Sequence, residues 1–196
     1  MNMNMHKKLW FVIIILLSTN ILYACNSNIS KPCKISIFSL TNHYDQLLSH
    51  TVKWDKNVKL FDAYVFITNN PQKMEASVTF ASNSKKFETI IVDYFNNSYT
   101  TYTVPHIKAI DFRESFDLAE MKYDSIEAYD LLITPEKEQY LCERLINHSN
   151  GIQLMRLYRS TYDNHLYWEL SIGDDSGGKY LSRLDTLTGE IYHFSY

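Results

Sequence analysis

The stretch Leu166-Tyr167-Trp168-Glu169-Leu170-Ser171-Ile172 places a large apolar residue at every second position. Successive side chains of a β-strand point to opposite faces, so this alternation predicts a strand with one buried and one exposed face. Residues 74–80 show the same alternation earlier in the chain. Half-buried strands are typical of antiparallel sheets, whereas parallel strands are buried on both faces. The two stretches therefore favour an antiparallel sheet over a βαβ arrangement.

A helical pattern precedes most of the strands in the first half of the chain. After a short strand expected at residues 35–39, Thr41 can cap a helix. The apolar face of this helix repeats at helical spacing and comprises Tyr44, Leu47, Leu48 and Val52. Strands are expected next at residues 63–67, 74–80, 87–94 and 99–104, separated by turn-forming Asn, Ser and Pro.

The second half of the chain repeats this order. Asp124 or Ser125 can cap a helix, and Glu127 lies three residues after Asp124, which is the spacing of a capping box. Thr134-Pro135 restarts a helix, which Asn150-Gly151 ends. Strands follow at residues 152–159, 166–172, 180–185 and 190–194.

Both halves thus combine a helix with antiparallel strands after it. We predict an α+β fold of two tandem units, residues 35–115 and 116–196. A single domain with an internal duplication is the other interpretation. The 15 Tyr and 10 Phe fit such sheets, because aromatic residues are enriched in strands. The net charge of −3 lacks the basic excess that nucleic-acid binding requires, so no nucleic-acid partner is predicted.

Residues 1–24 have the pattern of an export signal. His6, Lys7 and Lys8 form a basic start, and nine apolar residues follow at 9–17. Nine helical residues span about 14 Å, less than half of the ~30 Å hydrocarbon core of a membrane. The pattern therefore predicts a cleaved signal rather than a membrane-spanning helix.

The end of this signal resembles the lipobox of bacterial lipoproteins. In Leu22-Tyr23-Ala24-Cys25, a Leu and a small residue precede a Cys, as in that family. The resemblance implies cleavage between Ala24 and Cys25, lipidation of the Cys25 sulfur and attachment of the exported protein to a bacterial membrane. Residues 25–34 would then be the lipidated Cys and a tether. An ordinary secretory signal with a coincidental Cys and an uncleaved anchor helix are the alternatives.

Export would place the two remaining cysteines, Cys33 and Cys142, in a compartment where disulfides form. A single pair allows only one connectivity, so a Cys33–Cys142 disulfide is one prediction and two unrelated thiols are the alternative. Neither Cys belongs to a Cys-x-x-Cys motif or lies near a His cluster. We therefore predict no metal ion and no cofactor.

Three C-terminal segments resemble the PepSY family, namely residues 167–172, residues 179–185 and Thr188-Gly189-Glu190-Ile191. In that family an aromatic-led strand and a hairpin are followed by a strand that ends in Asp and a Thr-Gly-Glu turn into the last strand. Residues 123–128, Tyr-Asp-Ser-Ile-Glu-Ala, are similar to the helix start that precedes these segments. The resemblance covers the second unit, while the first unit matches only in outline.

The motif residues of this resemblance are Trp168, Asp185, Thr188 and Gly189, and their chemistry is structural. The Asp185 carboxylate can accept backbone N–H groups across the turn. Gly189 can take a positive φ that other residues resist. Trp168 is expected to anchor the core or a sheet face.

The PepSY resemblance implies a protein without catalytic residues. Such units occur in protease propeptides and envelope proteins, where inhibition or binding is suspected. We therefore expect a non-enzymatic, lipid-anchored module that binds or inhibits another envelope protein, with a peptidase as one candidate partner. The alternative is small-molecule or glycan binding in an aromatic groove, for which the Tyr content is the argument.

Three other patterns suggest chemistry that their context does not support. Residues 175–178, Asp-Ser-Gly-Gly, are similar to the nucleophile segment of chymotrypsin-like proteases, but they lie between two well-patterned strands and predict a hairpin loop. Asp174 and Asp175 are too few ligands for Ca²⁺. His43 and His50 could share a helix face, yet they lack the His-x-x-x-His spacing typical of zinc sites.

Overall fold

The computed structural model describes residues 33–147, 153–174 and 177–195. The predicted export signal, the predicted cleavage site Ala24-Cys25 and nearly all of the predicted tether lie outside the described residues. So do Asn150-Gly151, expected to end a helix, and part of the 175–178 loop. The chain from Lys34 onward is one compact unit. Among the described helices, none is long and apolar enough to cross a membrane.

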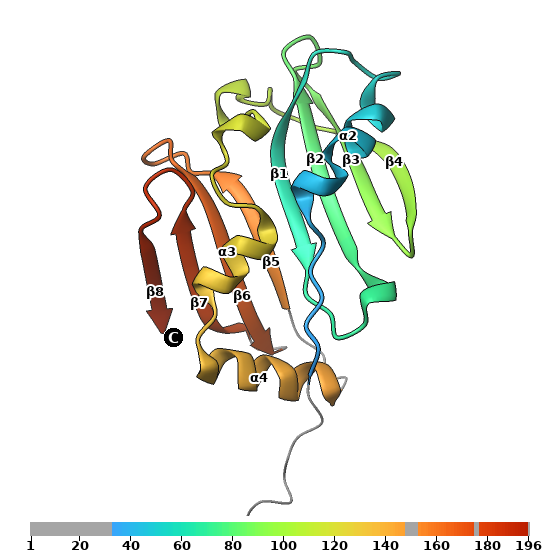
Figure 1. The fold of residues 1–196 in the computed structure, drawn as a ribbon. Helices are drawn as coiled ribbons and strands as arrows, with labels where there is room; N and C mark the ends of the chain where they lie inside the picture. The colour runs from blue at the N-terminus through green and yellow to red at the C-terminus, as the bar shows by residue number, and fades with distance from the viewer. Residues whose placement is uncertain (1–32, 148–152, 175–176, 196) are drawn as a thin grey trace, which may run out of the picture. The chain divides into compact units, whose positions relative to one another are not determined.

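Eight antiparallel strands form one sheet in the order β4-β3-β2-β1-β5-β6-β7-β8 (Figure 1). Each half is a meander of four consecutive strands, and the halves join where β1 pairs with β5. The strands are β1 Val58–Phe66, β2 Glu75–Ser82, β3 Glu88–Phe95, β4 Ser98–Pro105, β5 Gln153–Arg159, β6 Leu166–Asp174, β7 Gly177–Asp185 and β8 Ile191–Ser195. The predicted α+β class, with a helix followed by antiparallel strands, is confirmed.

The helices of the described chain lie on one side of this sheet (Figure 1). Helix α2, Leu40–Thr51, contacts β3 and β4, and α3, Ser125–Leu132, contacts β6 and β7. Helix α4, Pro135–Ile146, follows α3 and crosses one end of the second half. The opposite side, which we call the open face, has no helix in the described part of the chain.

The two helices that begin each half start side by side and share their capping groups. Asp124 is the N-cap of α3 and forms the predicted capping box with Glu127. Its carboxylate also accepts from the Ser39 hydroxyl at 2.6 Å and from the Thr41 backbone N–H at 3.1 Å. The Ser125 hydroxyl in turn donates to the Phe38 carbonyl at 2.6 Å. One carboxylate therefore binds the start of both helices.

Two local predictions in the first half are wrong, and a third is confirmed only in part. The N-cap of α2 is Ser39 rather than Thr41, because the helix starts two residues earlier than predicted and Ser39 Oγ accepts from the Asn42 N–H. In the predicted apolar face of α2, Leu47 is buried and Tyr44 and Leu48 pack against the core, whereas Val52 is 47% exposed. Residues 35–39 form only an isolated bridge between Ser36 and Thr68.

Apolar side chains between the helices and the sheet form one core. Trp168 is fully buried, and its indole N–H donates to the Tyr123 carbonyl at 2.9 Å. The other large, fully buried side chains come from both halves of the chain and include Phe38, Leu47, Leu60, Phe80, Phe116, Leu132, Leu141, Met155, Leu157 and Leu170. Because the two halves bury their side chains in one core, we expect them to unfold together.

Replacing Trp168 with Ala should destabilise the protein by about 3–5 kcal/mol, because the change removes a buried aromatic side chain and leaves a cavity. The free energy of unfolding in urea measures this loss. Tyr162→Ala is the control, since that side chain is 99% exposed. A loss no larger than that of the control would show that Trp168 does not anchor the core.

Candidate functional site

The turn between β7 and β8 contains three of the motif residues predicted from the sequence. Asp185 Oδ1 accepts from the backbone N–H groups of Leu187 at 2.8 Å and Thr188 at 3.1 Å. Gly189 has φ +80°, and its N–H donates to the Asp185 carbonyl. A Cβ at Gly189 would lie 3.0 Å from the Tyr123 hydroxyl. These contacts hold the turn and bring no reactive group to the surface.

His165 is a partner of Asp185 that the sequence did not suggest. Its Nδ1 lies 2.6 Å from Asp185 Oδ2, although the two residues are twenty positions apart. Burial opposes ionisation of Asp185, but the backbone N–H groups of Thr188 and Leu187, together with His165, outweigh it and lower the pKa of the carboxyl. Asp185 is therefore ionised at neutral pH, as a turn acceptor must be.

The structure says less about the other predicted site residues, Cys33, Cys142, His43 and His50. Cys33 and Cys142 both have partly buried side chains, and Cys142 lies in α4. The disulfide between them stays a prediction. His43 and His50 do share a face of α2, where both contact Tyr99 of β4. Within the described ranges, no three His, Cys, Asp or Glu side chains are placed to hold a metal ion.

The open face carries a strip of paired charges and Tyr rings that runs across β1, β5, β6 and β7. We call the following side chains the open-face strip: Asp62, Tyr64, Arg156, Tyr158, Glu169 and Arg183. Alternation explains its position, because Met155, Leu157, Trp168 and Leu170 turn inward and their neighbours must turn outward.

Two ion pairs order the strip. Arg156 Nε lies 3.1 Å from both carboxylate oxygens of Asp62, and Arg156 Nη2 lies 2.6 Å from Oδ2. Arg183 Nε donates to Glu169 Oε2 at 2.7 Å. The Arg156 guanidinium also stacks over the Tyr158 ring, with 4.7 Å between its carbon and the ring centroid. Such pairs fix each guanidinium plane while leaving part of it accessible.

Burial and Glu169 raise the pKa of Tyr158 to about 12. The phenol is therefore a neutral donor at physiological pH, and it donates to Glu169 Oε2 at 3.2 Å. Burial also raises the pKa of Asp62, and the hydrogen bonds from Arg156 oppose that rise. The strip is thus composed of charged side chains that form ion pairs and of hydrogen-bond donors.

Two polar cavities adjoin the strip. The first, of about 350 Å³, is lined by strip residues together with Phe61 and Tyr162. The second, of about 670 Å³, is lined by side chains that include Arg113, Glu120 and Arg159. Arg159 borders both cavities, and Glu120 holds its guanidinium at 2.5 Å. The cavities can accommodate polar side chains or a small polar ligand.

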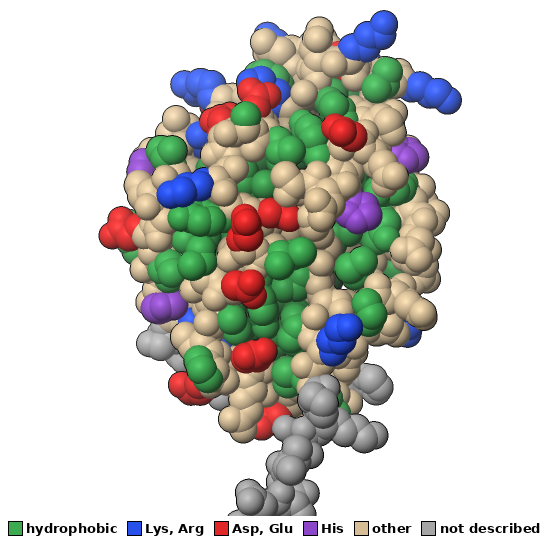
Figure 2. Space-filling view, in the orientation of Figure 1, with side chains coloured by type: hydrophobic (Ala, Val, Ile, Leu, Met, Phe, Trp, Pro, Cys, Tyr) green, Lys and Arg blue, Asp and Glu red, His purple; other side chains and the backbone are tan. Residues whose placement is uncertain are grey.

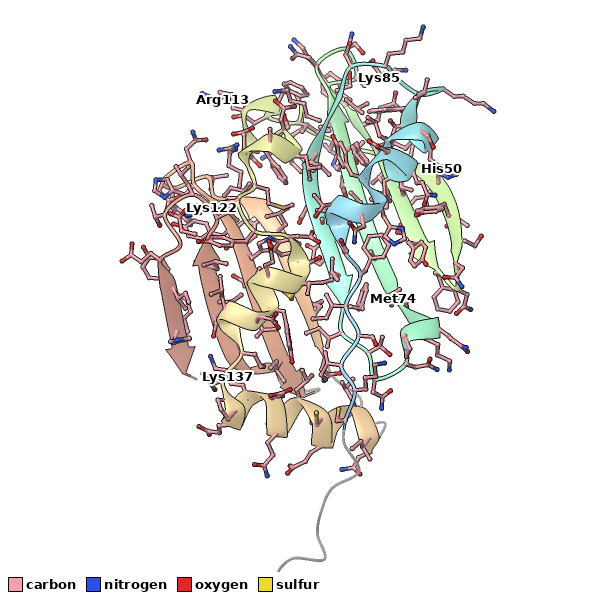
Figure 3. All side chains as sticks on the ribbon, viewed as in Figure 1. His50, Met74, Lys85, Arg113, Lys122 and Lys137 are labelled. Carbon is pink, nitrogen blue, oxygen red and sulfur yellow. The ribbon has the colours of Figure 1, made fainter. Side chains whose placement is uncertain are left out.

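A second cluster lies on the helix side, where α4 meets β7 and β8. Lys137 Nζ lies 2.6 Å from Ser182 Oγ and 3.0 Å from His193 Nδ1, and Ser182 Oγ is also 3.0 Å from that ring nitrogen. Lys137 is 8% exposed and Ser182 is 1% exposed. Figure 3 shows Lys137 at the start of α4, next to the end of the sheet.

The cluster has the residue types of a Ser–Lys hydrolase, but its Ser is not accessible to a substrate. A serine nucleophile must reach a substrate carbonyl, and Ser182 is almost fully covered. The cluster was not predicted, because Lys137 lies between Glu136 and Glu138 in what resembles an exposed helix start. We interpret it as a buried polar contact between α4 and the edge of the sheet.

Comparison of this chain with protein-family models, with curated proteins and with solved structures finds no match.

The Lys137 cluster should make the fold sensitive to acid. Burial, and then the Lys137 charge, lowers the pKa of His193 below its usual 6.5. The unfolded protein therefore binds this proton more readily than the folded protein. The His193 contribution to stability is complete above pH 6.5 and is lost as the pH falls through 6.5 toward the lower folded value.

The His193→Asn variant tests this dependence, because the Asn side-chain oxygen can still accept from Lys137 without titrating. We expect the urea midpoint of the natural protein to fall more steeply than that of the variant between about pH 7.5 and 5. Identical pH profiles for the two proteins would contradict the expectation. Lys137→Met should flatten the profile as well, because it removes the neighbouring charge.

Proposed function

We propose that this protein is a non-enzymatic binding module of the bacterial cell envelope that holds another envelope protein through its open face. The observation that carries the proposal is the open-face strip, a row of ordered Arg and Tyr side chains. Arg and Tyr are enriched at protein interfaces and among their energetic hot spots. The side chains of Arg156 and Arg183 are 37% and 38% exposed, so a partner can reach them.

The strip favours a partner surface with carboxylates and aromatic side chains. Each Arg already forms an ion pair with one carboxylate, and its remaining N–H groups can donate to a second acceptor. The adjoining cavities offer space for a side chain of the partner next to Arg159. The helix side has the opposite character, with acidic side chains along α3 (Figure 2). The two sides of the sheet would therefore select different partners.

We also propose that each half of the sheet is a PepSY-like unit. Each half consists of helix and then a four-stranded meander, and the halves meet at their first strands. The residues that resemble the family lie in β6, β7 and the turn into β8. A module of this kind restrains a partner by covering a surface, so a peptidase is a reasonable candidate.

Capture of envelope proteins from solubilised membranes tests the binding proposal. The full-length protein should retain a specific partner. The Arg183→Glu variant should capture at least about tenfold less of that partner, because reversal of a central interface charge costs more than about 1.4 kcal/mol of binding free energy. Lys122→Glu makes the same charge change on the helix side and should retain the partner. Equal capture by both variants would refute the open face as the site.

A small-molecule or glycan ligand is the second candidate, and Tyr158 and Tyr162 beside the 350 Å³ cavity favour it. The capture experiment separates the two candidates. If no protein is retained, while the natural protein binds an oligosaccharide array and Tyr158→Ala does not, the ligand is the correct interpretation.

We propose that Cys25 anchors the protein to the membrane through lipid. The Leu22-Tyr23-Ala24-Cys25 resemblance supports this step. Two or three acyl chains would hold the protein firmly, since one chain gives only reversible attachment. Cys25→Ala should accumulate as the unprocessed, larger form that takes up no labelled fatty acid. Normal processing and labelling of this variant would overturn the lipidation proposal, whereas Cys33→Ala should be labelled normally.

A further inference from the structure

The edge strand β4 lacks the features that usually protect the edge of a sheet. Its sequence, Ser98-Tyr99-Thr100-Thr101-Tyr102-Thr103-Val104-Pro105, contains no charged residue, and its only Pro is the last position. It pairs with β3 over all eight residues without a bulge. Charges, internal Pro, bulges and short length are the usual protections against edge-to-edge pairing. The opposite edge strand, β8, spans only five residues.

Exposed aromatic side chains are spread along the same edge. Phe95 at the end of β3 is 51% exposed, Tyr102 of β4 is 48% exposed, and Phe87 just before β3 is 58% exposed. Six of the eight residues of β4 are exposed, so the described part of the chain leaves this strand open to solvent (Figure 1). The strand therefore combines unpaired backbone groups with apolar surroundings.

The turn before β4 determines which backbone groups face outward. Asn96 and Asn97 have φ values of 49° and 59°, which is the geometry of a two-residue type I′ hairpin. In such a hairpin the flanking pair, Phe95 and Ser98, exchanges both backbone hydrogen bonds, and alternate pairs do so after it. Tyr99, Thr101 and Thr103 therefore direct their N–H and C=O groups away from β3.

We propose that β4 pairs with β4 of a second copy of this protein, in antiparallel orientation and with Thr101 on the two-fold axis. This register places Thr101 opposite Thr101 and Tyr99 opposite Thr103, so every residue with outward backbone groups meets another. About six hydrogen bonds form, and the two sheets become continuous. An axis midway between two residues would place outward groups against inward ones, and an axis on Thr100 or Tyr102 would pair one of the three residues with Asn97 of the turn or with Pro105, which has no N–H.

The side chains of this register are also compatible with each other. Thr100 faces Tyr102 of the second copy on the open face, and Thr/Tyr pairs are favourable across strands. No charge meets a like charge, because β4 carries none. A strand with these properties is its own complement, which is the argument for a second copy over another partner. The interface is small, so we expect a weak dimer, and attachment of both copies to one membrane would strengthen it.

A charge-swap experiment at Thr101 tests the pairing on the full-length protein in detergent. Thr101→Lys and Thr101→Glu each place like charges opposite one another and should weaken self-association at least about fivefold in analytical ultracentrifugation. An equal mixture of the two variants should restore the dimer. Thr161→Lys, which changes an exposed Thr in a distant turn, should leave it unchanged, and circular dichroism checks that each variant is folded.

Crosslinking on membranes gives an independent measurement. Strand pairing places the two Thr101 Cα atoms about 5.5 Å apart, within the range of a disulfide. Thr101→Cys should therefore form an oxidised dimer that Thr161→Cys does not form. The proposal is overturned if the natural protein stays monomeric at about 100 μM, if the mixture of charged variants stays monomeric, or if Thr101→Cys crosslinks only to a different protein.

Discussion

The Asp124 carboxylate is the contact on which the arrangement of the two halves depends. It caps α3, accepts from the Ser39 hydroxyl and from the Thr41 N–H, and so neutralises the exposed N–H groups of two helix starts at once. Ser39 and Thr41 each lie more than eighty positions before Asp124 in the chain. The neighbouring Ser125 is fully buried, and its hydroxyl adds a buried hydrogen bond to the Phe38 carbonyl at the same junction. The junction therefore fixes both helices on the same side of the sheet.

Because α2 and α3 both lie on one side of the sheet, their position determines which side chains can lie on the other side. Within the described residues, no second layer covers the side chains of β5 and β6 that point away from the helices, so polar or paired side chains are favoured there. Arg156 with Asp62 and Arg183 with Glu169 meet that requirement, and Tyr158 joins the two pairs. The polar pairs on the open face are thus a consequence of a one-sided fold.

Local chemistry was predictable from the sequence where it was repeated or self-contained. The alternation around Trp168, the Asp124–Glu127 capping box and the Pro135 helix start all depend on neighbours within a few residues. The start of α2 was misplaced because its cap involves Asp124, far away in the chain. Lys137, Ser182 and His193 were missed for the same reason, since their contact exists only after α4 packs against the sheet. Periodicity shows which face is buried, but not which distant side chains meet there.

Edge pairing and the open face are compatible with one another. A two-fold axis through Thr101 is perpendicular to the sheet, so both copies keep their open faces on the same side. The strip begins at β1, three strands away from β4, and remains uncovered. A dimer would therefore present two identical strips in one direction, and a partner with two matching surfaces would bind far more tightly than either strip alone allows. Weak pairing at β4 is sufficient for that effect, because the bound partner itself stabilises the dimer.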